Sequence, residues 1–206
     1  MLPTTQFAFR KGLGTYDALL CLSHALQSGS ESGQGVQFVT VDFIEAFDRV
    51  NHQRILYWLC SAGIGGSVLS ILTQFLSIRS QHVMLDGCRR KLVSVMAGLP
   101  QGRVLGPLLF FLYTLVFFYI LENKLIGYAD DSTLMAVVPS PGVRVTVAES
   151  LNRDLGRVCE WCDLWGMELY LSKTKTMIVY RSCTMHHQST PLNIGRTVPK
   201  QLSISQ

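Results

Sequence analysis

Two adjacent aspartates interrupt a strand-like stretch in the second half of the chain. The stretch is IGYADDSTLMAVV, Ile126 to Val138, and its apolar residues alternate as in a half-buried β-strand. Like charges this close repel each other, so a fold that keeps both ionised usually has a cation to hold. A hairpin turn is the alternative, because aspartate tolerates turn geometry. The sequence predicts a turn at Ala129 to Asp131 and leaves both readings of the acids open.

Composition indicates a folded domain. The chain has 206 residues, of which 48% are hydrophobic and 16% charged, with a net charge of +4. A chain of this length can bury a sizeable core, and the apolar content excludes a disordered tail. The mild positive charge suits a partner that carries phosphates without requiring one.

The cysteines allow one metal hypothesis. The spacing of Cys159 and Cys162, and of Cys183 and His186, is similar to two halves of a zinc site. The stronger interpretation puts Cys162 on the buried stripe of an amphipathic helix that ends near Gly166. We expect free thiols, because the residues that follow Met1 do not form a secretory signal.

An uncharged run from Val104 to Leu121 approaches the length of about 20 residues that crosses a bilayer. A membrane anchor is therefore one alternative. Gly106 and Pro107 disrupt its first turn, and amphipathic patterns flank it on both sides, so the sequence favours a buried core helix and no membrane partner.

The remaining pattern mixes helices and strands. A strand from Val36 to Phe43 delivers Asp42 near its end. The other expected elements are helices over 15–27, 52–62 and from Ser67, a polar loop over 28–35, a hairpin around Asp86 and Gly87, and a strand near 177–181. If the two acidic strands are neighbours in one sheet, their carboxylates converge, and two divalent metals held there could support nucleotidyl transfer.

Four segments in order carry a resemblance that spacing alone could not supply. TVDFIEAFDRVNHQRIL, GLPQGRVLGPLLF, YADD and SKTKTM are similar to motifs A, B, C and D of reverse transcriptases, and QFAFRKGLGTYDAL resembles the preceding motif. The whole set resembles the RNA-directed DNA polymerase of a non-LTR, jockey-like retrotransposon over about residues 6 to 181. It implies an α+β fold, a reverse-transcriptase-like palm with incomplete fingers and no complete thumb. The implied division is partial fingers over 1–35, palm over 36–181 and a poorly ordered extension over 182–206.

The resemblance also implies a metal site. Asp42, Asp130 and Asp131 match the catalytic acids, and the Phe43 backbone carbonyl would be a further metal ligand. Oxygen ligands favour two Mg²⁺ ions, with Mn²⁺ as a substitute. The implied partners are an RNA template, a DNA primer and dNTPs.

Further residues match positions that contact nucleotide or nucleic acid. Phe47 falls at the steric gate against a ribose 2′-hydroxyl, although an ordinary core Phe is an equal reading. Gln101 and Gly102 match the loop that touches the incoming nucleotide and the template. Arg10 and Lys11 match a motif that contacts phosphates. Lys173 or Lys175 could protonate the leaving group. Without the resemblance, all four would be interpreted as ordinary surface charges.

Three positions depart from the family pattern. They are Arg103, Thr114 and Tyr170, and each could loosen the surroundings of the acids. A catalytically inactive mobile-element remnant that at most binds nucleic acid is therefore the alternative function. The location expected is intracellular, with the nucleus implied by the family and no basic targeting cluster in the chain.

Overall fold

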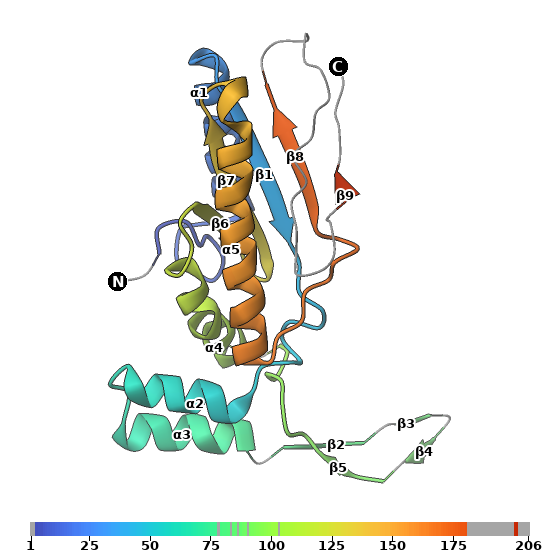
Figure 1. The fold of residues 1–206 in the computed structure, drawn as a ribbon. Helices are drawn as coiled ribbons and strands as arrows, with labels where there is room; N and C mark the ends of the chain where they lie inside the picture. The colour runs from blue at the N-terminus through green and yellow to red at the C-terminus, as the bar shows by residue number, and fades with distance from the viewer. Residues whose placement is uncertain are drawn as a thin grey trace. The chain divides into compact units, whose positions relative to one another are not determined.

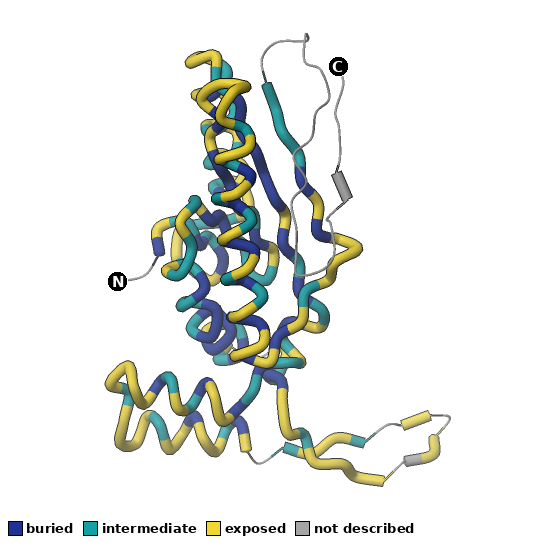
Figure 2. The backbone as a smooth tube through the Cα atoms, in the orientation of Figure 1, coloured by how far each residue is buried: buried dark blue, intermediate teal, exposed yellow. Residues whose placement is uncertain are grey.

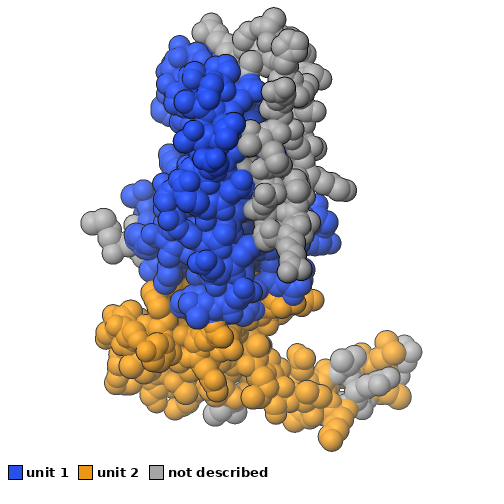
Figure 3. All heavy atoms as spheres, in the orientation of Figure 1, with its two compact units in different colours: residues 1–44, 114–206 blue, residues 45–113 orange. Residues whose placement is uncertain are grey.

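The computed structural model describes residues 3–77, 79–82, 84–85, 87–89, 91–102, 104–180 and 200–201. The chain divides into two compact units, coloured separately in Figure 3. Unit 1 consists of Met1–Ile44 and Thr114–Gln206, and unit 2 is Glu45–Tyr113. Both helices and strands occur, so the expected α+β class is confirmed.

Unit 1 is built on one sheet with β1 (Gly35–Val41) at its centre. The strand order is β6 (Lys124–Tyr128), β7 (Asp131–Val138), β1, β8 (Lys175–Val179) and β9 (Lys200–Gln201). All pairs are antiparallel except β8 with β9. Figure 1 shows β1 between β7 and β8. Six of the seven β1 residues are buried, as expected of a central strand rich in valine.

Two helices cover this sheet. Helix α1 (Thr15–Glu31) places Leu22 and Ala25 against a buried cluster that contains Phe38 of β1 and Met135 of β7. Helix α5 (Arg144–Trp165) runs along the sheet in Figure 1 and contacts β7. Its buried residues recur at helical spacing: Ala148, Leu151, Asp154, Leu155, Val158, Trp161, Cys162 and Trp165. The predicted burial of Cys162 is therefore confirmed.

Short 3₁₀ turns complete unit 1. They are η1 (Leu115–Phe118) and η2 (Pro141–Val143). Phe117 of η1 is fully enclosed, whereas η2 contains no buried residue. Figure 2 shows the buried backbone concentrated in the strands and along one side of α5.

Unit 2 contains three helices and an exposed hairpin region. The helices are α2 (His52–Ser61), α3 (Gly66–Ser77) and α4 (Leu105–Thr114), the last of which ends at the unit boundary. Strands β2 (Ser80–Gln81) and β5 (Val93–Ser94) pair, as do β3 (Met84–Leu85) and β4 (Cys88–Arg89). The expected hairpin around Gly87 is therefore present.

Helix ends agree with the sequence at several positions. The Asn51 side chain caps α2 by accepting from the Arg54 amide at 3.0 Å, and Gly63 follows α2 with φ +89°. Gly166 ends α5 in the left-handed conformation. Each of these residues has the chemistry that its terminus requires.

Other boundaries differ from the expectations. The N-cap of α1 is Gly14, and Asp17 in the first turn accepts from the Gly14 amide at 2.7 Å. The predicted polar loop from Ser28 is helical to Glu31, because Gly29 is not left-handed and the first left-handed glycine of this segment is Gly33. Helix α3 begins at Gly66, one residue before the expected start at Ser67.

The apolar run from Val104 to Leu121 is not one continuous helix. It consists of α4 followed by η1, with Phe110, Tyr113 and Phe117 almost completely buried. No helix in the described part of the chain is long and apolar enough to cross a membrane.

Some expectations lie outside the described residues. They concern Asp86, Arg103, the pair Cys183 and His186, and the extension 182–206 apart from β9. Five cysteines fall in the described part, and all five are free thiols, as expected: Cys21, Cys60, Cys88, Cys159 and Cys162.

Candidate functional site

The two acidic segments of unit 1 lie side by side. Strands β1 and β7 pair in antiparallel register, and the last pair joins Val41 to Ser132. Asp42 directly follows Val41, and Asp131 directly precedes Ser132, so the two acids come next along the same pairing. Residues opposite each other on antiparallel strands have Cα atoms about 5 Å apart. The expected convergence of these strand ends is therefore present in the backbone.

Asp130 lies in a tight turn next to Asp131. Tyr128 pairs with Asp131, which leaves Ala129 and Asp130 as a two-residue hairpin turn between β6 and β7. The turn is shorter than expected, because Asp131 already belongs to the strand. Ala129 has φ +57°, a left-handed conformation that costs a non-glycine residue about 1 kcal/mol. Such strain persists only where the surroundings hold it.

A buried glutamine, which the sequence reading missed, supports this turn. Gln6 is 1% exposed and forms a parallel bridge with Gly127 of β6. Its Nε2 lies 3.5 Å from the Ala129 carbonyl oxygen, and its Oε1 accepts from the Ala8 amide at 3.1 Å. The only sequence signal was a polar residue beside the apolar FAF triplet, which does not distinguish a buried glutamine from an exposed one.

The acids influence one another electrostatically. Partial burial raises the pKa of the Asp131 carboxyl, and the charges of Asp130 and Asp42 raise it further. Lys173 opposes this rise in the pKa of Asp131. The three acids and this lysine therefore form one charge cluster.

Lys173 is ion-paired with Asp42. Its Nζ lies 3.0 Å from Asp42 Oδ2, and this hydrogen bond raises the pKa of Lys173. The same ammonium lies 4.7 Å from the centroid of the Tyr170 ring, a cation–π distance. Lys175 is exposed on β8, opposite Thr40. Of the two candidate lysines, Lys173 is thus the one that contacts an acid.

Phe43 points its ring into an aromatic cluster. The ring centroid lies 5.8 Å from that of Phe117 and 5.8 Å from that of Trp161. Phe43 also bridges Leu169, through hydrogen bonds that use the Asp42 carbonyl and the Ile44 amide. The bridge does not use the Phe43 carbonyl, which is therefore available as an oxygen ligand for a metal ion. The packed ring holds this part of the backbone in place.

The donor set suits a hard cation, but it is not assembled into a metal cage. Asp42, Asp130, Asp131 and the Phe43 carbonyl offer oxygen only, which fits Mg²⁺ or Mn²⁺. Within the described ranges, no group of three or more His, Cys, Asp or Glu side chains is placed to hold a metal ion. The ion pair with Lys173 already occupies one carboxylate oxygen of Asp42.

The proposed nucleotide contacts lie in unit 2, on two segments that are hydrogen-bonded to each other. The ring of Phe47 stacks on Phe110 with centroids 4.3 Å apart, and its carbonyl accepts from the Leu99 amide at 2.9 Å. The Gln101 Nε2 lies 3.4 Å from Asp48 Oδ1. Gly102 has φ +74°, and a Cβ built there would meet nothing within 4 Å. The chain after motif A therefore pairs with the motif B loop.

The two N-terminal cations differ. Arg10 donates to the carbonyls of Pro3 at 2.9 Å and Gln6 at 3.2 Å, so it fastens the N-terminal turn. Lys11 is exposed. The structure thus gives Arg10 a local structural contact that the sequence did not predict.

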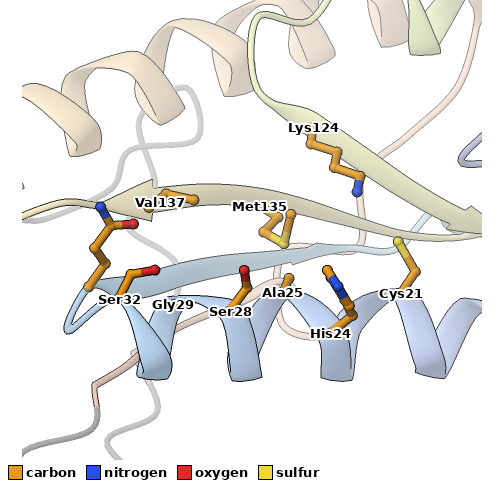
Figure 4. A pocket seen from close by; sticks show the side chains of 10 residues that line it. Cys21, His24, Ala25, Ser28, Gly29, Ser32, Lys124, Met135 and Val137 are labelled. Carbon is orange, nitrogen blue, oxygen red and sulfur yellow. The ribbon is translucent and has the colours of Figure 1, made fainter.

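A separate pocket of about 330 Å³ lies between α1 and the strands β6 and β7. Figure 4 shows His24 of α1, Lys124 of β6 and Met135 of β7 at this pocket. None of the residues that line it is acidic, so it is distinct from the carboxylate cluster.

Curated relatives of the chain are polymerases of mobile elements. The chain is 28% identical to the RNA-directed DNA polymerase from mobile element jockey of Drosophila funebris, over 84% of this chain and 19% of that protein. The jockey polymerase of Drosophila melanogaster is 27% identical and matches 100% of this chain and 24% of its own length. The chain therefore spans about a fifth to a quarter of these relatives.

Solved structures support the palm assignment. Telomerase from Candida albicans, solved with a fragment of telomeric RNA, superposes with a TM-score of 0.62 at 13% identity, over 90% of this chain and 32% of that one. Apo telomerase from Candida tropicalis, truncated from its C-terminal domain, gives a TM-score of 0.58 at 10% identity, over 84% of this chain and 36% of that one. At these identities the likeness shows the fold alone. The sequence matches the family described as reverse transcriptase (RNA-dependent DNA polymerase) over residues 1–198, and the chain therefore belongs to that family.

Proposed function

We propose that this chain carries the catalytic acids of an RNA-directed DNA polymerase, which transfers a nucleotide from a dNTP to the 3′-hydroxyl of a DNA primer on an RNA template. The observation that carries the proposal is the register of Val41 with Ser132, since it sets Asp42 beside the turn that bears Asp130. Family membership supports the reaction class.

The acids would hold two divalent cations. Asp42 and Asp130 are the principal ligands in this proposal, with Asp131 and the Phe43 carbonyl as additional donors. Bound Mg²⁺ would supply the positive charge that lowers the pKa of the attacking hydroxyl and offsets the charge of the leaving pyrophosphate. The burial of the Phe43 ring, at 4% exposure, fixes the backbone that presents these oxygens.

The second unit supplies nucleotide contacts in this proposal. Phe47 is fixed by its stack on Phe110, which suits a rigid ring that selects against a ribose hydroxyl. Gln101 and Gly102 would contact the incoming nucleotide, and the open space around Gly102 permits close approach of a ligand to the backbone. Arg10 and Lys11 remain candidate contacts for nucleic acid, and Lys173 or Lys175 for the leaving group.

Primer extension tests this function. The whole chain is given a DNA primer on an RNA template, Mg²⁺ and a single dNTP, and we expect one nucleotide to be added with little processive synthesis. Asp42→Asn and Asp130→Ala should each lower the rate by about a hundredfold or more, because each removes a ligand of the cations whose positive charge would stabilise the transition state. Glu149→Gln, on the exposed side of α5, is the charge-matched control. Extension unchanged by Asp130→Ala would contradict the site.

The alternative is an inactive chain that only binds nucleic acid. The pairing of Asp42 with Lys173 favours this alternative, because it neutralises the first metal ligand. Fluorescence anisotropy with the same RNA–DNA duplex separates the two. Binding by the wild-type chain without any nucleotide addition supports the alternative and contradicts catalysis.

A further inference from the structure

Asp42 already has a cation on its carboxylate. The Lys173 ammonium lies 3.0 Å from Asp42 Oδ2, where the Asp42 side chain is 21% exposed and the lysine side chain 61% exposed. The Tyr170 ring covers the same ammonium at 4.7 Å from its centroid. The ammonium of Lys173 thus contacts both the Asp42 carboxylate and the Tyr170 ring.

The turn that carries Lys173 is fastened to Asp42 itself. The Tyr170 amide donates to the Asp42 carbonyl at 2.8 Å. The Tyr170 carbonyl then accepts from the Lys173 and Thr174 amides at 3.0 and 3.1 Å. Thr174 is completely buried, and its hydroxyl donates to the same carbonyl at 3.2 Å. The backbone therefore keeps Lys173 within reach of the acid even though its side chain is largely exposed.

We propose that Lys173 is an internal counterion that occupies Asp42 when no divalent cation is bound and leaves it when a cation binds. This inference rests on the proposed function, since it requires Asp42 to be a metal ligand. A metal ion bound at Oδ2 would lie within about 5 Å of the ammonium, because Mg²⁺ approaches carboxylate oxygens to about 2.1 Å, and the two positive charges would repel each other. The exchange requires no change in the protonation of Lys173.

The charge cluster gives this exchange a physical reason. Asp42 and Asp130 repel the charge on Asp131, and Lys173 is the cation that offsets this repulsion. Without Lys173 or a bound metal ion, the negative charges of the three neighbouring acids would not be offset. The lysine stabilises the metal-free cluster and, for the same reason, competes with the metal.

Metal binding without nucleotide measures the competition directly. Mn²⁺ is titrated into the whole chain, and free Mn²⁺ is followed by electron paramagnetic resonance. Lys173→Met removes the ammonium and keeps the apolar stem, and we expect Mn²⁺ to bind about three- to tenfold more tightly. Lys124→Met makes the same change in net charge on β6, next to the separate pocket, and should alter the affinity by less than about twofold.

Further variants separate this inference from the proposed function. Asp42→Asn should weaken Mn²⁺ binding in both the wild-type and the Lys173→Met chain, and if it weakens neither, the metal site itself is wrong. If Asp42→Asn does weaken binding, while the Mn²⁺ affinity of Lys173→Met is equal to or lower than that of Lys124→Met, the counterion proposal is wrong and the metal-site proposal stands. Lys173→Arg should retain the wild-type affinity, and Lys173→Gln replaces the methionine variant if that chain does not fold by circular dichroism. Absence of Mn²⁺ binding by both chains overturns both proposals.

Discussion

Val41 pairs with Ser132 at the end of the β1–β7 ladder, and Asp42 and Asp131 are the next residues along this register. A shift of one residue would turn each side chain of the strand to the other face of the sheet. Burial of apolar residues on both paired strands holds this register, since Val41 and Val39 of β1 and Leu134 of β7 are all less than 3% exposed. The hydrophobic core of unit 1 thereby sets the spacing of the acids.

Asp131→Asn should stabilise the metal-free chain at neutral pH. The folded-state pKa of Asp131 is raised, so the folded chain holds this proton more tightly than the unfolded chain. The stability therefore falls as the pH rises from about 4, the unfolded value, through the raised folded value. Asparagine cannot ionise, so the Asp131→Asn chain does not lose this stability as the pH rises. The gain should be about 1 kcal/mol or less, because the carboxyl is partly exposed and solvent screens it.

Urea unfolding at pH 4 and at pH 7, in a chelating buffer, measures this difference. The advantage of Asp131→Asn should be small at pH 4 and larger at pH 7. Glu149→Gln is the control for loss of a surface carboxylate and should show no such increase. A variant less stable than wild type at pH 7 would show that Asp131 is not under electrostatic strain.

Asp154→Ala should cost about 3–5 kcal/mol of folding stability. The carboxylate is completely buried on α5, and it accepts from the backbone amides of Glu122 and Asn123 at 2.8 Å each. It also pairs with Arg157 at 3.0 Å. Alanine leaves these donors without an acceptor at the start of β6, the strand that leads to Asp130.

The measurement is denaturant unfolding followed by circular dichroism. Asp163→Ala, on the exposed side of the same helix, is the matched control and should cost less than about 0.5 kcal/mol. Equal losses for the two substitutions would contradict a structural task for the buried carboxylate.

Local chemistry allowed the elements around the acids to be predicted from the sequence. Asn51, Gly63 and Gly166 stand at helix ends that require their hydrogen bonding or their backbone freedom. The strand ending near Asp42 and the hairpin at Asp130 were likewise readable from alternation and turn residues. Alternation within one segment does not say which segment lies beside it, so the adjacency of β1 and β7 had no sequence signal of its own. The family resemblance supplied it instead.

Contacts between distant residues could not be predicted. Lys173 looked like any exposed lysine, and its pairing with Asp42 depends on a turn fastened by Tyr170. Tyr170 itself was noted only as a departure from the family pattern, yet its ring lies under that ammonium. Gln6 and Asp154 were missed because single polar residues give no sign of burial until a partner is known. Gln6 contacts Ala129, 123 positions away in the chain, and Asp154 accepts from Asn123, 31 positions away.

Gly98→Ala should destabilise unit 2 far more than Gly102→Ala. Both glycines have positive φ, at +85° and +74°. A Cβ at Gly98 would lie 2.9 Å from the Asp48 carbonyl oxygen and 3.0 Å from the Asp48 Cα, whereas a Cβ at Gly102 meets nothing within 4 Å. Gly102→Ala should therefore cost about 1 kcal/mol from backbone strain alone. Gly98→Ala should add about 1–3 kcal/mol, because backbone atoms of the turn at Asp48 must move.

Thermal unfolding of the two variants checks this difference, and hydrogen exchange at the Leu99 amide adds a local measurement. Leu99 donates to the Phe47 carbonyl at 2.9 Å, so its protection should fall in Gly98→Ala and persist in Gly102→Ala. Similar losses at both positions would show that the motif B loop does not pack against the chain at Asp48.

Cys162 should resist alkylation in the folded chain. Burial, together with the neighbouring charges of Cys159 and Asp163, raises the pKa of its thiol to about 12. Because the thiolate is the reactive form, both this pKa and the packing of α5 oppose reaction. Cys60 and Cys88 are exposed and serve as internal controls. Mass spectrometry after a short iodoacetamide pulse at pH 8 should find these two modified and Cys162 unmodified, with all three modified in urea. Labelling of Cys162 at the rate of Cys60 would mean that α5 does not bury its apolar stripe, and the sheet that aligns Asp42 with Asp131 would lose its cover.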